Sequence, residues 1–531
     1  PTVDTPADQT YDLPNAGDQE PLAEYRIANV KTSSVDKDAT AAVLKYADFS
    51  HYADYFNGME DENIAQAIPN AKASEWMEEN IPLFECPQRN FEEMYYYRWW
   101  SLRKHIKETP VGYGMTEFLV QRSYSDKYNL IACAIGHHIY ESRWLRDPKY
   151  LDQIIHTWYR GNDGGPMNKM NKFSSWNADA VLARYMVDAD KDFMLDMKEN
   201  LEAEYQRWEC TNRLQNGLYW QGDVQDGMEE SISGGRKKKY ARPTINSYMY
   251  GNAKALSLMG ILSDDEGMAM RYGMRADTLK RLVQDKLWNS RHQFFETMRA
   301  DSSANVREAI GYIPWYFNLP DTVKQYEVAW KEIMDENGFS APYGLTTAER
   351  RHPEFRTHGV GKCEWDGAIW PFASAQTLTA MANFMNNYPQ RVLSDSVYFR
   401  QMELYVESQY HRGRPYIGEY LDEVTGYWLK GDQERSRYYN HSTFNDLMIT
   451  GLIGLRPRLD DTVEVNPLIP ADKWDWFCLD NVLYHGRNLT ILWDKYGDRY
   501  HRGKGLRIFV DGKQVGYADR LTRIICENVL K

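Results

Sequence analysis

The sequence predicts a mainly α-helical fold with a small antiparallel β unit at its C-terminal end. Helical hydrophobic periodicity dominates residues 140–455, long loops recur between those helices, and the pattern changes to alternation after Pro457. Helices and strands do not alternate along the chain, which excludes a parallel α/β fold. A helical bundle and a closed helical barrel both fit, whereas the absence of a repeat of about 34 or 40 residues argues against a solenoid.

The helical part is recognised by apolar residues at positions i, i+3, i+4 and i+7. Leu151, Ile154, Ile155 and Trp158 form one such stripe, and the same spacing recurs at 249–259 and 279–287. Long ordered loops are usually functional, and here they occupy 159–177, 209–246, 336–366 and 411–442. Their recurrence favours a barrel of helical hairpins whose loops gather at one end.

The C-terminal part has the alternation of β-strands. Leu506, Ile508 and Val510 alternate with polar neighbours and lead into Asp511-Gly512, a pair typical of a tight hairpin turn. We therefore expect residues 458–531 to form a small β unit packed on a helical body that spans 46–457. Residues 1–45 are expected to be an extended lead-in, compatible with the remnant of an upstream module.

Composition excludes several classes of partner and site. The net charge of −13 argues against nucleic acid or an anionic membrane as the main partner. No apolar run reaches about 18 residues, so no membrane span is expected. The six cysteines are widely spaced and form no CxxC pair, which indicates buried thiols rather than a disulfide scaffold or a zinc ribbon.

The familiar cofactor and nucleophile motifs are also missing from the sequence. It contains no phosphate-binding P-loop, no GxGxxG after a strand, no HExxH and no GxSxG. His137-His138 with Glu141 is more typical of a structural cluster than of a metal site. No cofactor is expected, and a structural calcium ion stays open.

Three segments place carboxylates among glycines and aromatic rings rather than on a charged helix face. They are 217–235 with Asp223, Asp226, Glu229 and Glu230, 363–371 with Glu364 and Asp366, and 416–428 with Glu419, Asp422 and Glu423. A partly apolar setting raises the pKa of a carboxyl group and keeps it protonated near neutral pH. Two such groups across a substrate can be the acid and base of glycoside hydrolysis. Each segment alone is better explained as turn-forming acids beside core aromatics.

Together, however, the three segments resemble a known family. Residues 226–231, 365–371 and 419–426 are similar to its motifs SGxDNSP, WRGPxWP and ExYxPxTG, in that order. The family is the six-hairpin (α/α)6 glycoside hydrolases that include processing α-glucosidase I and mannosylglycerate hydrolase. The resemblance covers about residues 90–455 and looks closest to the polysaccharide-degrading members of Bacteroidetes.

The resemblance implies an inverting hydrolase with an (α/α)6 barrel. By position, Glu229 would be the general acid and Glu419 the general base, with Asp226 as an alternative acid. The residues expected to contact the sugar are Arg98, Trp99, Trp100, Trp220, Asp226, Trp365, Asp366, Trp370, Tyr420 and His441. Glu229 stands where the α-glucosidases have Asp, and Asp366 replaces a basic residue of the family motif. The resemblance therefore predicts the class of reaction better than it predicts the substrate.

The predicted function is therefore hydrolysis of a glycosidic bond in an oligo- or polysaccharide. We expect exo action on a plant or host glycan, with α-glucosidase-like or arabinofuranosidase specificity, in the periplasm or outside the cell. Two alternatives stay open. The first is a polysaccharide lyase on the same barrel, which is compatible with His358, Tyr410, His411 and Arg412. The second is a carbohydrate-binding protein that has the same barrel but is catalytically silent.

Overall fold

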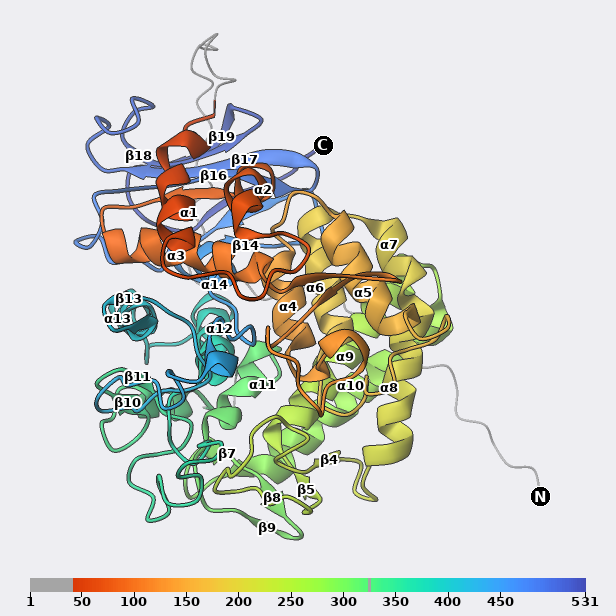
Figure 1. Cartoon of the computed structure of the whole chain (residues 1–531). Coiled ribbons are helices and arrows are strands. Elements are labelled where there is room, and N and C mark those ends of the chain that lie inside the picture. Colours follow the sequence, from red (N-terminus) through yellow and green to blue (C-terminus); the bar gives the residue numbers. More distant parts are fainter. Residues whose placement is uncertain (1–41, 323–325) are drawn as a thin grey trace.

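The structure, a computed structural model, describes residues 42–322 and 326–531. The expected lead-in therefore lies almost wholly outside the described residues. Helices dominate most of the chain, and a β-sheet lies at one end of the molecule beside the first three helices (Figure 1). The helices are α1 (Ser50–Asn57), α2 (Ala73–Asn80), α3 (Arg89–Arg103), α4 (Ile135–Ser142), α5 (Lys149–Arg160), α6 (Asn177–Asp188), α7 (Lys191–Asp196), α8 (Lys198–Asn212), α9 (Pro243–Leu262), α10 (Glu266–Leu287), α11 (Ile313–Tyr316), α12 (Pro371–Asn387), α13 (Asp395–Ser408) and α14 (Asn445–Leu447).

The two longest helices, α9 and α10, form a helical hairpin. Pro243 opens α9, where a missing N–H costs nothing, and the side chain of Asp265 caps α10 by accepting from Met268 N at 2.9 Å. A Cβ on Gly260 would lie 2.5 Å from the backbone nitrogen of Ala269, so only glycine lets the two helices approach this closely. The apolar stripes predicted at 249–259 and 279–287 lie on these helices.

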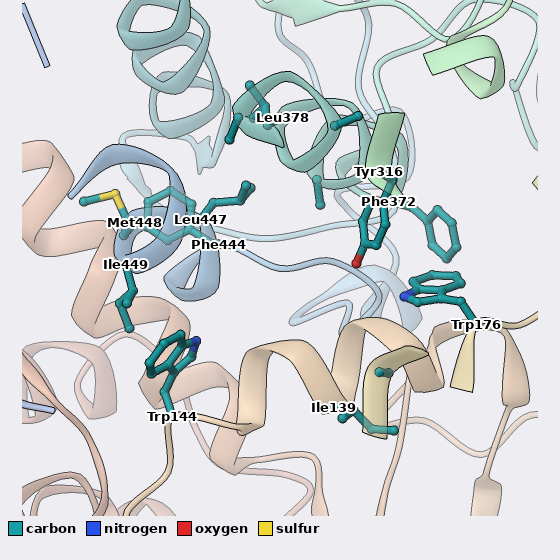
Figure 2. Packing of buried hydrophobic residues seen from close by; sticks show 14 of the residues in the cluster. Ile139, Trp144, Trp176, Tyr316, Phe372, Leu378, Phe444, Leu447, Met448 and Ile449 are labelled. Carbon is teal, nitrogen blue, oxygen red and sulfur yellow. The ribbon is translucent and has the colours of Figure 1, made fainter. Parts of the chain in front are cut away.

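The core joins helices that are far apart in the sequence. Large side chains from α4, α11, α12 and the segment around α14 pack together, as Figure 2 shows. The labelled members are Ile139, Trp144, Trp176, Tyr316, Phe372, Leu378, Phe444, Leu447, Met448 and Ile449. Rings and branched side chains of this size remove much apolar surface from water, which is the main force holding the helices in place.

The largest sheet is antiparallel and has the order β1 (Leu83–Glu85), β16 (Trp476–Tyr484), β17 (Arg487–Asp494), β18 (Gly505–Val510), β19 (Lys513–Ala518). The predicted turn at Asp511-Gly512 is confirmed, because both residues have positive φ (47° and 76°), as a two-residue hairpin requires. The sequence did not predict that β1 joins this sheet. Three residues are too few to show alternation, and pairing with Cys478–Asp480 defines the strand.

Six smaller sheets accompany it among the described residues, and four of them are two-stranded. The other two have three and four strands. β14 (Leu455–Arg456), β15 (Val463–Val465) and β20 (Ile524–Cys526) form one, and β4 (Trp220–Gln221), β5 (Tyr240–Ala241), β8 (Met298–Arg299) and β9 (Ser302–Ser303) form the other. The second sheet matters for the site, because the acidic loop 222–239 connects β4 to β5. Within the described ranges, no helix is both long and apolar enough to cross a membrane.

Candidate active site

The loop between β4 and β5 folds back on itself and presents Glu229. The backbone N–H of Met228 donates to the carbonyl of Asp223 at 2.8 Å, which closes the turn. Gly227 and Glu230 both have positive φ (72° and 66°), and this conformation is strained for a glutamate. The turn leaves the side chain of Glu229 half-buried.

Asp226, three residues before Glu229, anchors this loop. Its side chain is fully enclosed, with Oδ2 accepting from Arg242 Nε at 2.7 Å and from the hydroxyl of Thr244. Arg242 immediately precedes α9, so the ion pair fixes the acidic loop to the start of a long helix. Arg242 and Thr244 thus hold the carboxylate of Asp226 in the protein interior, away from solvent.

Glu419 lies on a different segment and is held in a positive environment. Its carboxylate oxygen Oε2 lies 3.2 Å from the guanidinium of Arg435 and 3.6 Å from Lys430 Nζ. The hydroxyl of Ser436 lies 3.5 Å from the same oxygen. The carboxylate is buried, and both cations lie near the same oxygen.

Glu229 and Glu419 lie within electrostatic range of each other, and a third carboxylate, Glu117, joins them. Burial raises the pKa of Glu229 to about 7, and the negative charges of Glu419 and Asp223 add to the rise. Burial also raises the pKa of Glu117 to about 8, with contributions from Glu419 and Glu229, although a hydrogen bond from Tyr439 acts in the opposite direction. The tyrosine hydroxyl donates to Oε1 of Glu117 at 2.7 Å.

The predicted aromatic residues fall into two groups. Trp365, Trp370 and Tyr420 form a continuous stack, with ring centroids 4.5 Å apart at both steps. Trp99 and Trp100 are instead wholly enclosed among core side chains, and the indole N–H of Trp100 donates to Asn57 at 2.8 Å. Trp220 is partly exposed, with Lys239 Nζ 4.4 Å from its ring centroid.

The predicted polar contacts are occupied by protein partners. Arg98 donates to Gln409 Oε1 and to the carbonyl of Ser442, both at 2.7 Å. Asp366 accepts from the backbone nitrogens of His358 at 2.6 Å and Gly359 at 3.0 Å, and thereby fixes the loop that precedes it. In this structure both side chains support the loops of the site.

His441 differs from these residues, because it has no hydrogen-bonding partner among the described residues at either ring nitrogen. Burial holds its pKa well below the ordinary value, so the ring is neutral. Its ring centroid lies 3.9 Å from that of Tyr439, which hydrogen-bonds Glu117. His441 therefore belongs to the same neighbourhood as the carboxylates.

Residues 42–322 and 326–531 contain no group of three or more His, Cys, Asp or Glu arranged to hold a metal ion. His138 Nε2 lies 2.7 Å from the carbonyl oxygen of Asn440, in keeping with the structural interpretation of this histidine pair. A cavity of about 490 Å³ is lined by neither Glu229 nor Glu419. The two carboxylates differ in burial and in the charges beside them, a contrast that is typical of an acid and a base in catalysis.

Comparison with known proteins agrees with this chemistry. Residues 127–442, more than half of the chain, match the family described as the mannosylglycerate hydrolase MGH1-like glycoside hydrolase domain. The chain therefore belongs to that family. Residues 455–516 of this glycoside hydrolase match the C-terminal domain of glycosyl hydrolase family 65.

Solved structures show the same relationship. The hydrolase is 91% identical, with a TM-score of 0.92, to a chain named "Sialidase", and it spans 49% of the length of that chain. The GH63 mannosylglycerate hydrolase from Thermus thermophilus, in complex with glucose, is 12% identical over 67% of this chain and 99% of its own, with a TM-score of 0.50. A GH78 family rhamnosidase of Bacillus sp. GL1 is 11% identical over 81% of this chain and 41% of its own, with a TM-score of 0.53.

Sequence reasoning missed three residues around the carboxylates of this hydrolase. Lys430 and Arg435 lie 11 and 16 positions after Glu419, in a loop with no regular periodicity, so their contact with it could not be anticipated. No motif marked Glu117, which lies upstream of the three acidic segments. The one available signal was an isolated acid followed by Phe118 in an otherwise apolar run.

Proposed function

We propose that this glycoside hydrolase works by inversion, with Glu229 as the general acid and Glu419 as the general base. The observation that carries the proposal is the contrast between the two groups. Glu229 has a pKa raised to about 7, so much of it holds a proton at neutral pH, whereas Glu419 is paired with Arg435 and Lys430. A neutral acid and an ionised base are what inverting hydrolysis requires.

The proposed reaction needs no covalent intermediate. Glu229 donates its proton to the glycosidic oxygen as the bond to the anomeric carbon breaks. Water attacks that carbon from the opposite face and gives its proton to Glu419. The products are an alcohol and a sugar of inverted anomeric configuration, and the two carboxyl groups would stand roughly 6.5–9.5 Å apart to admit the water.

Sugar binding is proposed for the predicted residues in two ways. Trp220 is partly exposed and offers a ring face for stacking. The stack of Trp365, Trp370 and Tyr420 is proposed to form the pocket wall. Arg98, Asp226, Asp366 and the enclosed Trp99 and Trp100 are proposed to support that wall from the protein interior. The unpaired ring nitrogens of the neutral His441 could exchange a hydrogen bond with a sugar hydroxyl.

The finer architecture and setting are also proposals. We propose that residues 46–457 close into an (α/α)6 barrel and that 458–531 form the β unit, following 1–45 as a lead-in. The fold-level likeness to the GH63 hydrolase supports this. The substrate would be an oligo- or polysaccharide from a plant or host, attacked from its end, in the periplasm or outside the cell and without a cofactor.

The test combines a substrate screen with two variants. Nitrophenyl glycosides and plant or host glycans, including α-glucosides, α-mannosides, α-rhamnosides, L-arabinofuranosides and sialosides, should identify a hydrolysed substrate. Glu229→Gln and Glu419→Gln should then each lower kcat by at least about a thousandfold while the circular dichroism spectrum stays that of the wild type. An NMR time course should show the inverted anomer first. Full activity in either variant, or retention of configuration, would refute the assigned roles.

A further inference from the structure

One cavity among the described residues lies next to Tyr416, three residues before Glu419. It has a volume of about 490 Å³ and is bounded by α3, by the hairpin of β12 (Tyr410–His411) and β13 (Arg414–Pro415), and by the loop 431–438. Its lining includes Tyr97, Arg412, Arg414, Tyr416, Arg437 and Tyr438. A cavity of this size suits one or two sugar units better than a single small ion.

The lining carries an excess of positive charge. Three arginines face one carboxylate, that of Asp432, which lies 2.8 Å from the guanidinium of Arg412 and 3.5 Å from the ring of His411. The guanidinium of Arg414 is exposed and has neither an ion pair nor a hydrogen bond within the described ranges. The cavity therefore has a cationic group available for a ligand.

Arg437 is only partly neutralised. It lies 3.6 Å from Glu60 Oε2, but Glu60 is closer to Lys104, at 2.5 Å. Planar guanidinium groups bind carboxylate and sulfate oxygens through two parallel hydrogen bonds. The arginines of this cavity thus favour an anionic ligand, and a long polyanion is disfavoured by the net charge of −13 on the chain.

Tyr97 lies at the floor of the cavity. Its ring is fully buried, and its hydroxyl lies beside the backbone of Ile417 with no surface open to a ligand. The neighbouring hydroxyl of Tyr416 donates to the carbonyl of Gly431 at 3.2 Å, which leaves the ring of Tyr416 to line the cavity.

From these contacts we infer that the cavity binds an acidic sugar unit through its carboxylate or sulfate group, at a site separate from Glu229 and Glu419. The arginines hold the anionic group, and the rings of Tyr416 and Tyr438 cover the apolar face of the sugar. This site is additional to the proposed reaction, and binding to it does not require turnover.

The inference is tested by isothermal titration calorimetry on the full chain. The probes are D-glucuronate, D-glucose 6-sulfate, D-glucose and inorganic sulfate. At least one acidic sugar should bind at least tenfold more tightly than both D-glucose and inorganic sulfate. The acidic sugar that binds more tightly shows whether the cavity prefers a carboxylate or a sulfate group. Equal binding of glucose, or of sulfate alone, would overturn the inference, as would no binding by either acidic sugar.

Variants locate the binding. Arg414→Gln should weaken binding of the acidic sugar at least tenfold, because it removes a guanidinium that no protein group among the described residues uses. Arg400→Gln, which removes an exposed arginine from α13 outside the cavity, is the matched control and should change nothing. Glu419→Gln should bind as the wild type does. If Glu419→Gln abolishes binding while Arg414→Gln does not, the ligand occupies the carboxylate site and the inference is wrong.

Discussion

The guanidinium of Arg435 lies 3.2 Å from Oε2 of Glu419, and both residues come from the loop-rich region after α13. This pairing ties the ionised state of the proposed base to a residue that takes no part in the proposed bond breaking. A cation at this distance is worth more in a buried site than on the surface, because few water molecules screen it. Arg435 is therefore a positioning residue whose loss has a recognisable kinetic signature.

Arg435→Gln should lower kcat/KM about tenfold at neutral pH, because the carboxylate loses a charged hydrogen-bonding partner. The loss should fall on kcat rather than on KM, because Arg435 positions Glu419 and is not proposed to contact the sugar. The fall in activity above about pH 7, set by deprotonation of Glu229, should stay where it is. Steady-state kinetics separate kcat from KM, and the pH profile of kcat/KM locates the limb set by Glu229.

Arg400→Gln is the control for this profile, because Arg400 is an exposed arginine that pairs with Glu403 and Glu407 on its own helix. It should leave kcat, KM and the pH profile unchanged. A loss in Arg435→Gln that falls on KM, or that moves the limb set by Glu229, would contradict the positioning role.

The candidate carboxylates could be named from the sequence because local motifs carry them. Glycine beside acidic and aromatic residues predicts a turn that presents a carboxyl group, and Glu229 and Glu419 remain predictions on that basis. The partners of those carboxylates depend on contacts between distant segments. Tyr439 reaches Glu117 across more than three hundred positions, and no spacing rule describes such a contact.

The same limit applies to the fold. Helical periodicity predicted α9 and α10, and the Asp511-Gly512 pair predicted the turn between β18 and β19. Strand β1 escaped prediction because three residues acquire their conformation from the strand they pair with. For Trp99 and Trp100, sequence could not distinguish a pocket wall from the core, because both need a large apolar ring on a helix.

Asp226→Asn should destabilise the protein by about 3–5 kcal/mol, because it leaves the guanidinium of Arg242 buried without a carboxylate beside it. The free energy of unfolding in urea at pH 7 measures the effect. Asp475→Asn, which breaks the exposed pair with Lys495, is the matched control and should leave the unfolding midpoint close to that of the wild type. A stable but inactive Asp226→Asn would show instead that Asp226 is the catalytic acid.

Glu117→Gln should make stability less sensitive to pH. The pKa of Glu117 is about 8 in the folded protein, against an ordinary value of 4.5, so the folded state keeps a proton that the unfolded chain releases. Stability must then fall as the pH rises between these two values, and the fall is complete above about pH 8. Glutamine cannot titrate, so the free energy of unfolding of the variant should rise relative to that of the wild type as the pH increases over this range.

Urea unfolding at pH 5, 7 and 9 tests this expectation. The difference in the free energy of unfolding between Glu117→Gln and the wild type should grow from pH 5 to pH 9 in favour of the variant. Glu199→Gln, a change at an exposed position on α8, should give the same small difference at all three values. A difference for Glu117→Gln that does not vary with pH would mean that Glu117 is already ionised in the folded protein, and its role beside Glu229 and Glu419 would have to be that of a fixed negative charge.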